Sequence, residues 1–419
     1  MHFAKRILQM DTEILRQTLA LAAQKEVISF AGGLPAPESF PVEAMRQATD
    51  EVYRTQGRAA LQYGPSSGYL PLREKLAQRL TGQGISCTAE NILIVSGSQQ
   101  GLDLAGKVFL EPGDLVVCEN PTYLAALTVF RSYECGLLPI ETDDDGMVPE
   151  DLERQLAAHP KVRLMYIIPS FQNPTGRTWS LERRKQILEI ARRYELPILE
   201  DNPYGELRYE GETVPTLKSM DATGIVTYMG SFSKVLSPGI RLGWLLAERG
   251  LIEKYESAKE CADLQASTLT QMVVDTYLEH NDLDANIRRL NDLYRGRRDR
   301  MLALLASEFP EGSRWTHPCG GLFLWVTMPE GIDTDALLPT MAAHKAAYIP
   351  GRTFFADGNE HRCLRLNYSN ASEEDMTRGM TIMGQVFRDA LAKGEKGMEL
   401  TEVSILGLGA EGSIAFRAL

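Results

Sequence analysis

One lysine stands among small and hydroxylated residues in the segment 229–244, which reads MGSFSKVLSPGIRLGW. Lys234 follows an apolar run that predicts a buried strand, so a pocket can receive its amine. Such an amine can form a Schiff base with a carbonyl compound. The nearby hydroxyls and the guanidinium of Arg241 suit a phosphate, which arginine binds through a planar fork of donors. Pyridoxal 5'-phosphate carries both groups; the alternative is a surface lysine in a Ser/Gly loop.

A carboxylate follows a second apolar run, in LPILEDNPYGE at 196–206. Asp201 is expected at the carboxyl end of a strand, where ligands bind in open α/β sheets. An aspartate at that place can pair with a protonated pyridine nitrogen. Tyr204 follows three positions later and can donate to the phenolate oxygen of the same ring. The alternative is that Asp-Asn-Pro simply opens a turn.

Two further loops follow apolar strands. The run LMYIIPSFQNPTG at 164–176 carries Asn173, whose amide can reach a ring oxygen, although Asn-Pro is also an ordinary turn. The run ILIVSGSQQG at 92–101 opens a helix at 99–110, and free backbone N–H groups at a helix start bind phosphate. This loop is neither a P-loop nor the dinucleotide-binding GxGxxG motif. By itself this loop is weak evidence for a phosphate site.

Taken in order, SGSQQGL, NPTY, NPTG, EDNPYGEL, GSFSKVLSPGIRLGW and CLRLNYS resemble the fold-type I pyridoxal 5'-phosphate (PLP)-dependent aminotransferases of classes I and II. The chain is most similar to the subgroup of 2-aminoadipate, kynurenine and aromatic aminotransferases. The same module forms the effector domain of MocR-type transcription regulators. The runs FAGGLPAPESFP at 30–41 and LQYGPSSGYLPLRE at 61–74 strengthen this resemblance, which covers about residues 10–395.

The resemblance implies a cofactor site. Lys234 would form the Schiff base and move the proton, and Asp201 would hold the pyridinium nitrogen. Asn173 and Tyr204 would hold the ring 3-oxygen, which makes Lys234, Asp201 and Tyr204 the catalytic set. Tyr123, in NPTY, would stack on the ring face. The phosphate would be bound by hydroxyl, amide and guanidinium groups of Ser98, Gln99, Ser231, Ser233 and Arg241.

The resemblance also implies a substrate site and a partner subunit. Arg365, in CLRLN, would clamp the substrate α-carboxylate with two hydrogen bonds. Gly33 would bring its backbone close to the substrate, beside Asn173. Tyr63 would reach the phosphate from the other subunit of a homodimer. No departure from the family pattern is evident at these positions.

The implied reaction moves the amino group of an L-amino acid to a 2-oxo acid, by resemblance 2-oxoglutarate, in a ping-pong exchange. A related PLP-dependent lyase or decarboxylase stays open, because the same residues bind PLP in those reactions. A regulator's effector domain is the rival from another class, but it needs a DNA-reading head, and FAGG at 30–33 leaves no room before it. Substrate choice stays undetermined; the loops expected to set it are 13–40, 63–69 and 264–268.

The composition limits which classes of protein this chain can belong to. The net charge of −12 argues against nucleic-acid binding, which needs a basic surface. The six cysteines form no CxxC pair and no metal-ligand cluster with the histidines, so we expect no metal and a reducing cytoplasm. No signal-peptide core and no membrane-length apolar run is present.

The elements that must position these residues alternate along the chain. Short apolar runs predict strands at 92–95, 115–119, 136–140, 163–167, 197–200, 225–229 and 242–247. Amphipathic helices such as 181–194 lie between them, which favours an α/β fold with a mostly parallel, seven-stranded-type sheet covered on both faces.

The pattern of predicted helices and strands changes after this alternation. A long helix at 281–308 is expected to lead into a smaller α+β domain, with strands at 321–326 and 363–368 and helices at 334–344 and 373–393. We therefore expect an N-terminal segment at 1–40, with a helix at 13–24, that packs with the small domain and the cleft. The remaining divisions are a large PLP-binding domain at 41–290, a small domain at 291–395 and a tail of unknown role at 396–419.

Overall fold

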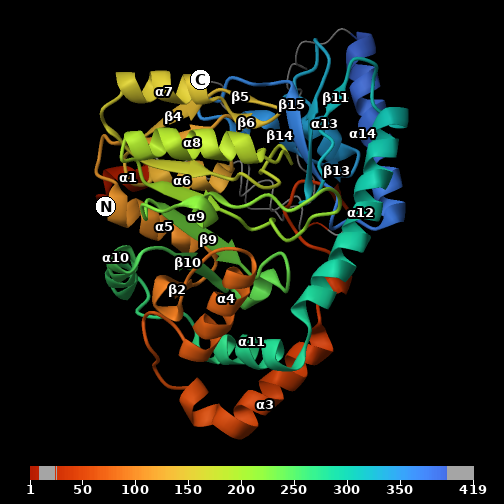
Figure 1. The fold of residues 1–419 in the computed structure, drawn as a ribbon. Coiled ribbons are helices and arrows are strands. Elements are labelled where there is room, and N and C mark those ends of the chain that lie inside the picture. Colours follow the sequence, from red (N-terminus) through yellow and green to blue (C-terminus); the bar gives the residue numbers. More distant parts are fainter. Residues whose placement is uncertain (9–23, 25, 394–419) are drawn as a thin grey trace.

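The structure is a computed structural model that describes residues 1–8, 24 and 26–393 (Figure 1). The helix predicted at 13–24 falls almost entirely outside the described residues, and the tail at 396–419 lies wholly outside them. No helix of the described part combines the length and apolar character needed to cross a membrane.

A seven-stranded sheet forms the centre of the molecule. Its strands, in order across the sheet, are β2 (Ile92–Val95), β10 (Gly243–Leu246), β9 (Val226–Ser231), β8 (Ile198–Asp201), β7 (Val162–Ile167), β3 (Leu115–Glu119) and β4 (Gly136–Ile140). Neighbours are parallel except β10, which is antiparallel to both β2 and β9. The mostly parallel sheet predicted from the apolar runs is therefore confirmed, with all seven strands near their predicted bounds.

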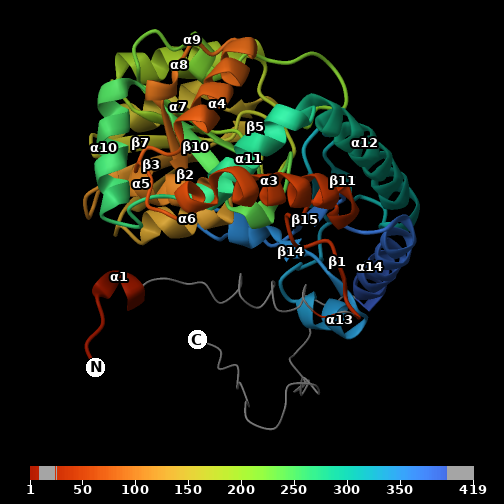
Figure 2. The same cartoon turned by 90° about the horizontal axis from the view of Figure 1, so that it is seen from below.

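Helices cover both faces of this sheet (Figure 2). One face packs on α5 (Ser98–Phe109), α6 (Leu124–Arg131) and α10 (Arg249–Glu260). The opposite face packs on α7 (Pro149–Ala158), α8 (Leu181–Arg193) and α9 (Leu217–Met220). Strand side chains alternate between the two faces, which is why the central strands read as continuous apolar runs. Because all strands except β10 run in the same direction, their carboxyl ends lie at one edge of the sheet.

A second, smaller sheet lies beyond the long helix α12 (Leu283–Glu308). It is antiparallel, in the order β11 (Arg314–Trp315), β12 (Phe323–Thr327), β15 (Cys363–Asn367) and β14 (Ile349–Pro350). The helix α14 (Glu373–Lys393) packs alongside α12 (Figures 1 and 2). Strand β1 (Ile28–Ser29) pairs with β13 (Ala346–Ala347), so the N-terminal segment joins this unit.

The helix predicted at 334–344 is shorter than expected. It begins only at α13 (Leu338–Ala343), because Pro339 in its first turn has no backbone N–H with which to continue a helix from the residues before it. The remaining elements of the described part are α1 (Lys5–Leu8), α3 (Val42–Ala60), α4 (Leu70–Gly82), β5 (Thr142–Asp143), β6 (Gly146–Met147), α11 (Thr268–His280) and four short 3-10 turns.

Candidate active site

The carboxyl ends of the central strands bring the predicted residues together. Asp201 is the last residue of β8, and Ser231 is the last residue of the neighbouring β9. Lys234 follows Ser231 by three positions, and Ser98 begins α5 just after β2. These are the positions at which ligands bind in open α/β sheets.

Lys234 contacts the N-terminal segment. Its ammonium donates a 2.7 Å hydrogen bond to the carbonyl oxygen of Gly33. Desolvation, and then the charges of Arg365 and Arg241, lower the pKa of this amine to about 8. The neutral, nucleophilic form of this lysine is therefore present at a lower pH than for an ordinary lysine.

Asp201 is a buried carboxylate with one oxygen left over. Its side chain is 2 % exposed, and Oδ2 accepts a 2.9 Å hydrogen bond from the Tyr166 hydroxyl. Oδ1 is buried with no hydrogen-bond partner. Burial raises the pKa of the carboxyl group to about 7, and the Tyr166 hydrogen bond opposes that rise. A buried acceptor without a partner is costly, so the residue fits a ligand that brings a donor, such as a protonated ring nitrogen.

The side chain of Arg365 reaches from the small sheet to a loop of the large one. It lies on β15, and its guanidinium donates to Asn173 Oδ1 at 2.8 Å and to the Ala31 carbonyl oxygen at 2.5 Å. The guanidinium carbon lies 4.2 Å from the ring centroid of Phe323 and 4.9 Å from that of Phe354. Burial lowers the pKa of Arg365 to about 10, and its Nε has no partner. The fork is therefore held between two rings, with donor capacity to spare.

Tyr204 and Tyr123 border the same space. Tyr204 is buried, and its ring meets the Phe323 ring edge to face at 5.7 Å. Burial raises the pKa of both phenols, and the Asp201 charge contributes to each rise, which places both tyrosines near that carboxylate. Tyr123 precedes α6, and the adjacent Thr122 amide donates to the Phe354 carbonyl oxygen at 2.8 Å.

The phosphate-binding candidates gather at the start of α5. Gly97 has φ +82°, and a Cβ on it would lie 2.6 Å from Arg241 Nη2, so the loop needs glycine there. Arg241 donates to the Ser96 carbonyl oxygen at 3.2 Å, and Ser231 Oγ donates to Ser233 Oγ at 2.9 Å. Ser98 and Gln99 supply amides from the first turn, which a helix cannot satisfy internally.

Tyr63 is the one predicted residue set apart from the others in a single chain. Its side chain is 78 % exposed, and among the described residues no hydrogen bond of its hydroxyl joins it to the site. Several large apolar side chains of the same region are also exposed, namely those of Val42, Tyr53, Leu61, Leu70 and Leu264.

The sequence did not single out Tyr166, Phe323, Phe354 or Ala31. The last three depend on how the second sheet and the N-terminal segment meet the first, which no local pattern records. Tyr166 could have been noticed in the sequence, because it lies in the buried strand that leads to the Asn173-Pro174 turn.

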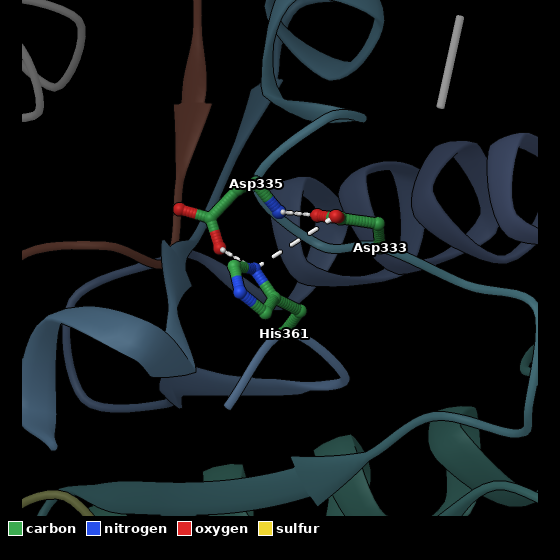
Figure 3. A group of neighbouring side chains, drawn as sticks. All are labelled: Asp333, Asp335 and His361. Carbon is green, nitrogen blue, oxygen red and sulfur yellow. Dashed lines mark hydrogen bonds and ion pairs between the residues drawn. The ribbon is translucent and has the colours of Figure 1, made fainter. Parts of the chain in front are cut away.

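A group of possible metal ligands lies in the smaller unit, away from these residues. His361 Nδ1 lies 3.5 Å from Asp335 Oδ2 and 3.8 Å from Asp333 Oδ2, and Figure 3 shows the three side chains facing one another. The three side chains offer ligand atoms within 4.8 Å of one another. Asp335 also pairs with Arg352 at 3.2 Å, and Asp333 accepts the amides of the turn before α13. These contacts explain the cluster as an ion-paired turn.

Comparisons with protein families, sequences and solved structures show which known proteins the chain resembles. Residues 25–382 match the family model described as aminotransferase class I and II. The chain is 44% identical to aromatic-amino-acid aminotransferase 1 of Thermococcus litoralis, over 94% of this chain and 95% of that one. A crystal structure of Pyrococcus horikoshii kynurenine aminotransferase, in complex with PMP, is similar with a TM-score of 0.89 and 42% identity, covering 93% of this chain and 97% of that one.

Two further similarities bear on the site. LysN, an α-aminoadipate aminotransferase of Thermus thermophilus solved with N-(5'-phosphopyridoxyl)-L-leucine, has a TM-score of 0.88 and 36% identity, covering 93% of this chain and 98% of that one. The helix-turn-helix regulator YdfD of Bacillus subtilis is 31% identical over 91% of this chain and 78% of the regulator.

Proposed function

The chain belongs to the class I and II aminotransferases and is a PLP-dependent enzyme that transfers amino groups; from this premise we propose that it passes the amino group of an L-amino acid to 2-oxoglutarate by a ping-pong exchange. The observation that carries the proposal is that Lys234 and Asp201 lie at the carboxyl ends of the large sheet's strands, while the guanidinium of Arg365 reaches Asn173 from β15 of the small sheet. Each presents unused chemistry: an amine with a lowered pKa, a free carboxylate oxygen and a spare guanidinium donor.

The cofactor, when bound, supplies an electron sink for the charge left when the α-proton departs. Lys234 Nζ then takes that proton and returns it, a role that its lowered pKa suits at neutral to mildly basic pH. Asp201 Oδ1 would accept a hydrogen bond from the protonated ring nitrogen. Asn173 and Tyr204 would donate to the ring 3-oxygen, and Tyr123 would stack on the ring. These assignments make Lys234, Asp201 and Tyr204 the catalytic residues.

The phosphate is assigned to the start of α5 and the loop after β9. Arg241 supplies charge there, and its exposed side chain can meet an incoming dianion. The other groups assigned to the phosphate are the amides and hydroxyls of Ser98, Gln99, Ser231 and Ser233.

The substrate carboxylate is assigned to Arg365. Its fork is already oriented by Asn173 and Ala31 and stacked between two phenylalanine rings, so little entropy is lost when the carboxylate binds. Gly33 lies beside it: a Cβ there would meet the Phe323 ring at 3.1 Å. A larger residue at this position would therefore crowd Phe323, the ring on which the Arg365 guanidinium stacks.

We infer a homodimer in which Tyr63 of each subunit completes the phosphate site of the other. Its exposed phenol, amid exposed apolar side chains, supports that inference. The net charge of −12 supports small molecules rather than nucleic acid as partners, despite the similarity to regulators. All six cysteines are free, which supports a reducing compartment such as the cytoplasm.

The division into domains remains part of this proposal: a segment at 1–40 with the small unit and cleft, a large domain at 41–290 and a small domain at 291–395. Strand β1, which pairs with β13, supports the first assignment. The seven-stranded sheet lies within the second range, and the four-stranded sheet lies within the third.

A half-reaction screen tests the function. The holoenzyme is mixed with single L-amino acids in the absence of any 2-oxo acid, and loss of the cofactor's visible absorbance is recorded together with the products. We propose that aromatic amino acids are among the donors, because two of the similar proteins are named for aromatic amino acids or kynurenine. A 2-oxo acid formed in stoichiometric yield, with 2-oxoglutarate restoring the absorbance, supports the proposal. Release of carbon dioxide or of an eliminated side chain instead would identify a decarboxylase or a lyase.

A further inference from the structure

We propose that Tyr166 is a positioning residue for Asp201. Its phenol occupies one carboxylate oxygen, so that the other is left for the ring nitrogen of the cofactor. This inference rests on the proposed function, because it gives Tyr166 a part in the same chemistry through Asp201.

Strand geometry places the two residues on one face. Tyr166 lies on β7 and pairs with Leu199 of the neighbouring parallel strand β8. Asp201 is two positions beyond Leu199 and therefore points to the same side of the sheet. Leu164, Tyr166 and Leu199 belong to the core that packs on α5, α6 and α10. The phenol can therefore reach along this face toward the carboxyl edge.

The tyrosine is fixed in place. Its side chain is fully buried, and its ring meets Phe130 of α6 edge to face at 5.7 Å. The hydroxyl lies 2.9 Å from Asp201 Oδ2 and must donate, because an ionised carboxylate only accepts. Burial and the Asp201 charge raise the pKa of this phenol well above its usual value, so it remains a donor throughout the working pH range.

The two oxygens of Asp201 are consequently unequal. Oδ2 is taken by Tyr166, whereas Oδ1 is buried without a partner. Among the described residues, Tyr166 is the only side chain hydrogen-bonded to this carboxylate, so it orients Asp201 before the cofactor binds. The same hydrogen bond favours the ionised form in a place where burial favours the neutral one. Both effects help the carboxylate to hold a ring nitrogen in its protonated state.

The test compares Tyr166→Phe with a matched Tyr255→Phe variant in the holoenzyme. Tyr255 is also fully buried in the same core, and its hydroxyl lies 3.2 Å from Thr227 Oγ1. We expect Tyr166→Phe to lower kcat by about ten- to a hundredfold, with little change in KM, the range seen when a group that orients a metal-binding side chain is removed. Tyr255→Phe should leave kcat unchanged.

A spectroscopic readout separates positioning from packing. The visible absorbance of the bound cofactor titrates with pH, and a ring nitrogen that is held less firmly in its protonated state carries less positive charge. The titration midpoint should therefore move to higher pH in Tyr166→Phe and stay unchanged in Tyr255→Phe. In an Asp201→Asn background, adding Tyr166→Phe should have no further effect on midpoint or kcat, because the tyrosine acts through Asp201.

Two outcomes would overturn the inference while leaving the proposed function intact: wild-type midpoint and kcat in Tyr166→Phe, or effects that simply add to those of Asp201→Asn. Failure of the wild-type half-reaction would instead reject the proposed function. If Tyr166→Phe does not fold, 3-fluorotyrosine at position 166 takes its place, since it keeps the ring but changes the strength of the hydrogen bond. The midpoint must then differ from wild type, and an unchanged midpoint rejects the positioning role.

Discussion

The Lys234 ammonium donates a hydrogen bond to the carbonyl oxygen of Gly33 over 2.7 Å, although the two residues stand 201 positions apart. This contact joins the N-terminal segment to the loop after β9, and it gives the amine one hydrogen bond in a desolvated setting. Its protonation state should therefore govern how readily the apoenzyme accepts its cofactor.

The rate at which the apoenzyme takes up PLP should rise with pH and level off near pH 8. Only the neutral amine attacks a carbonyl, and desolvation together with Arg365 and Arg241 lowers the pKa of Lys234 to about 8. Below that pH the neutral fraction falls by about tenfold per unit. Stopped-flow absorbance across a pH series measures the rate. Free Nα-acetyl-lysine is the control, and its rate should keep rising beyond pH 9; a parallel rise for the apoenzyme would show that the pKa is not lowered.

Asp201→Asn should retain the cofactor but lose at least about a hundredfold in the rate of the half-reaction, the lower range for loss of a preorganised electrostatic group. An amide cannot hold the ring nitrogen in its protonated state. Single-turnover absorbance measures the rate, and gel filtration with cofactor quantification measures retention. A rate near that of the wild type would mean that Asp201 serves only as a turn residue.

Arg365→Lys should raise KM for the amino acid by about ten- to a hundredfold, since a charged bidentate contact is reduced to a point charge. Arg362→Lys is the matched control, because Arg362 is exposed and stands just before the same strand. Steady-state kinetics with one donor and a fixed 2-oxo acid gives both constants. An unchanged KM in the Arg365 variant would reject its assignment to the carboxylate.

Mixed dimers should regain activity that neither parent has. If Tyr63 serves the partner's site, a Tyr63→Phe chain paired with a Lys234→Ala chain has one site with both lesions and one with neither. Random pairing makes half of the dimers mixed, so refolding an equal mixture should restore about a quarter of the wild-type activity.

This complementation requires that Tyr63→Phe be severely impaired alone; otherwise Tyr63→Asp replaces it. Light scattering confirms that dimers have formed. Dimers without any recovery would show that each site is built within a single chain.

The sequence predicted the large sheet well because buried parallel strands leave apolar runs that end at ligand-binding loops. It therefore located Lys234 and Asp201 at strand ends. It could not reveal that Arg365 meets Asn173, because that contact depends on how two separate sheets meet. The pairing of Tyr166 with Asp201 likewise depends on β7 and β8 being neighbours, which no single strand records. The helix predicted at 334–344 was too long because Pro339 lies inside the predicted range and the helix forms only around it.

The central claim is that Lys234 carries the cofactor, and it predicts that Lys234→Ala abolishes transamination while some PLP stays bound through Asp201 and Arg241. The most direct test reduces the wild-type holoenzyme with borohydride, which fixes the bond, and maps the peptides by mass spectrometry. We predict one phosphopyridoxyl group, on the peptide that contains Lys234. Its appearance on a different lysine, or on none, would contradict the account.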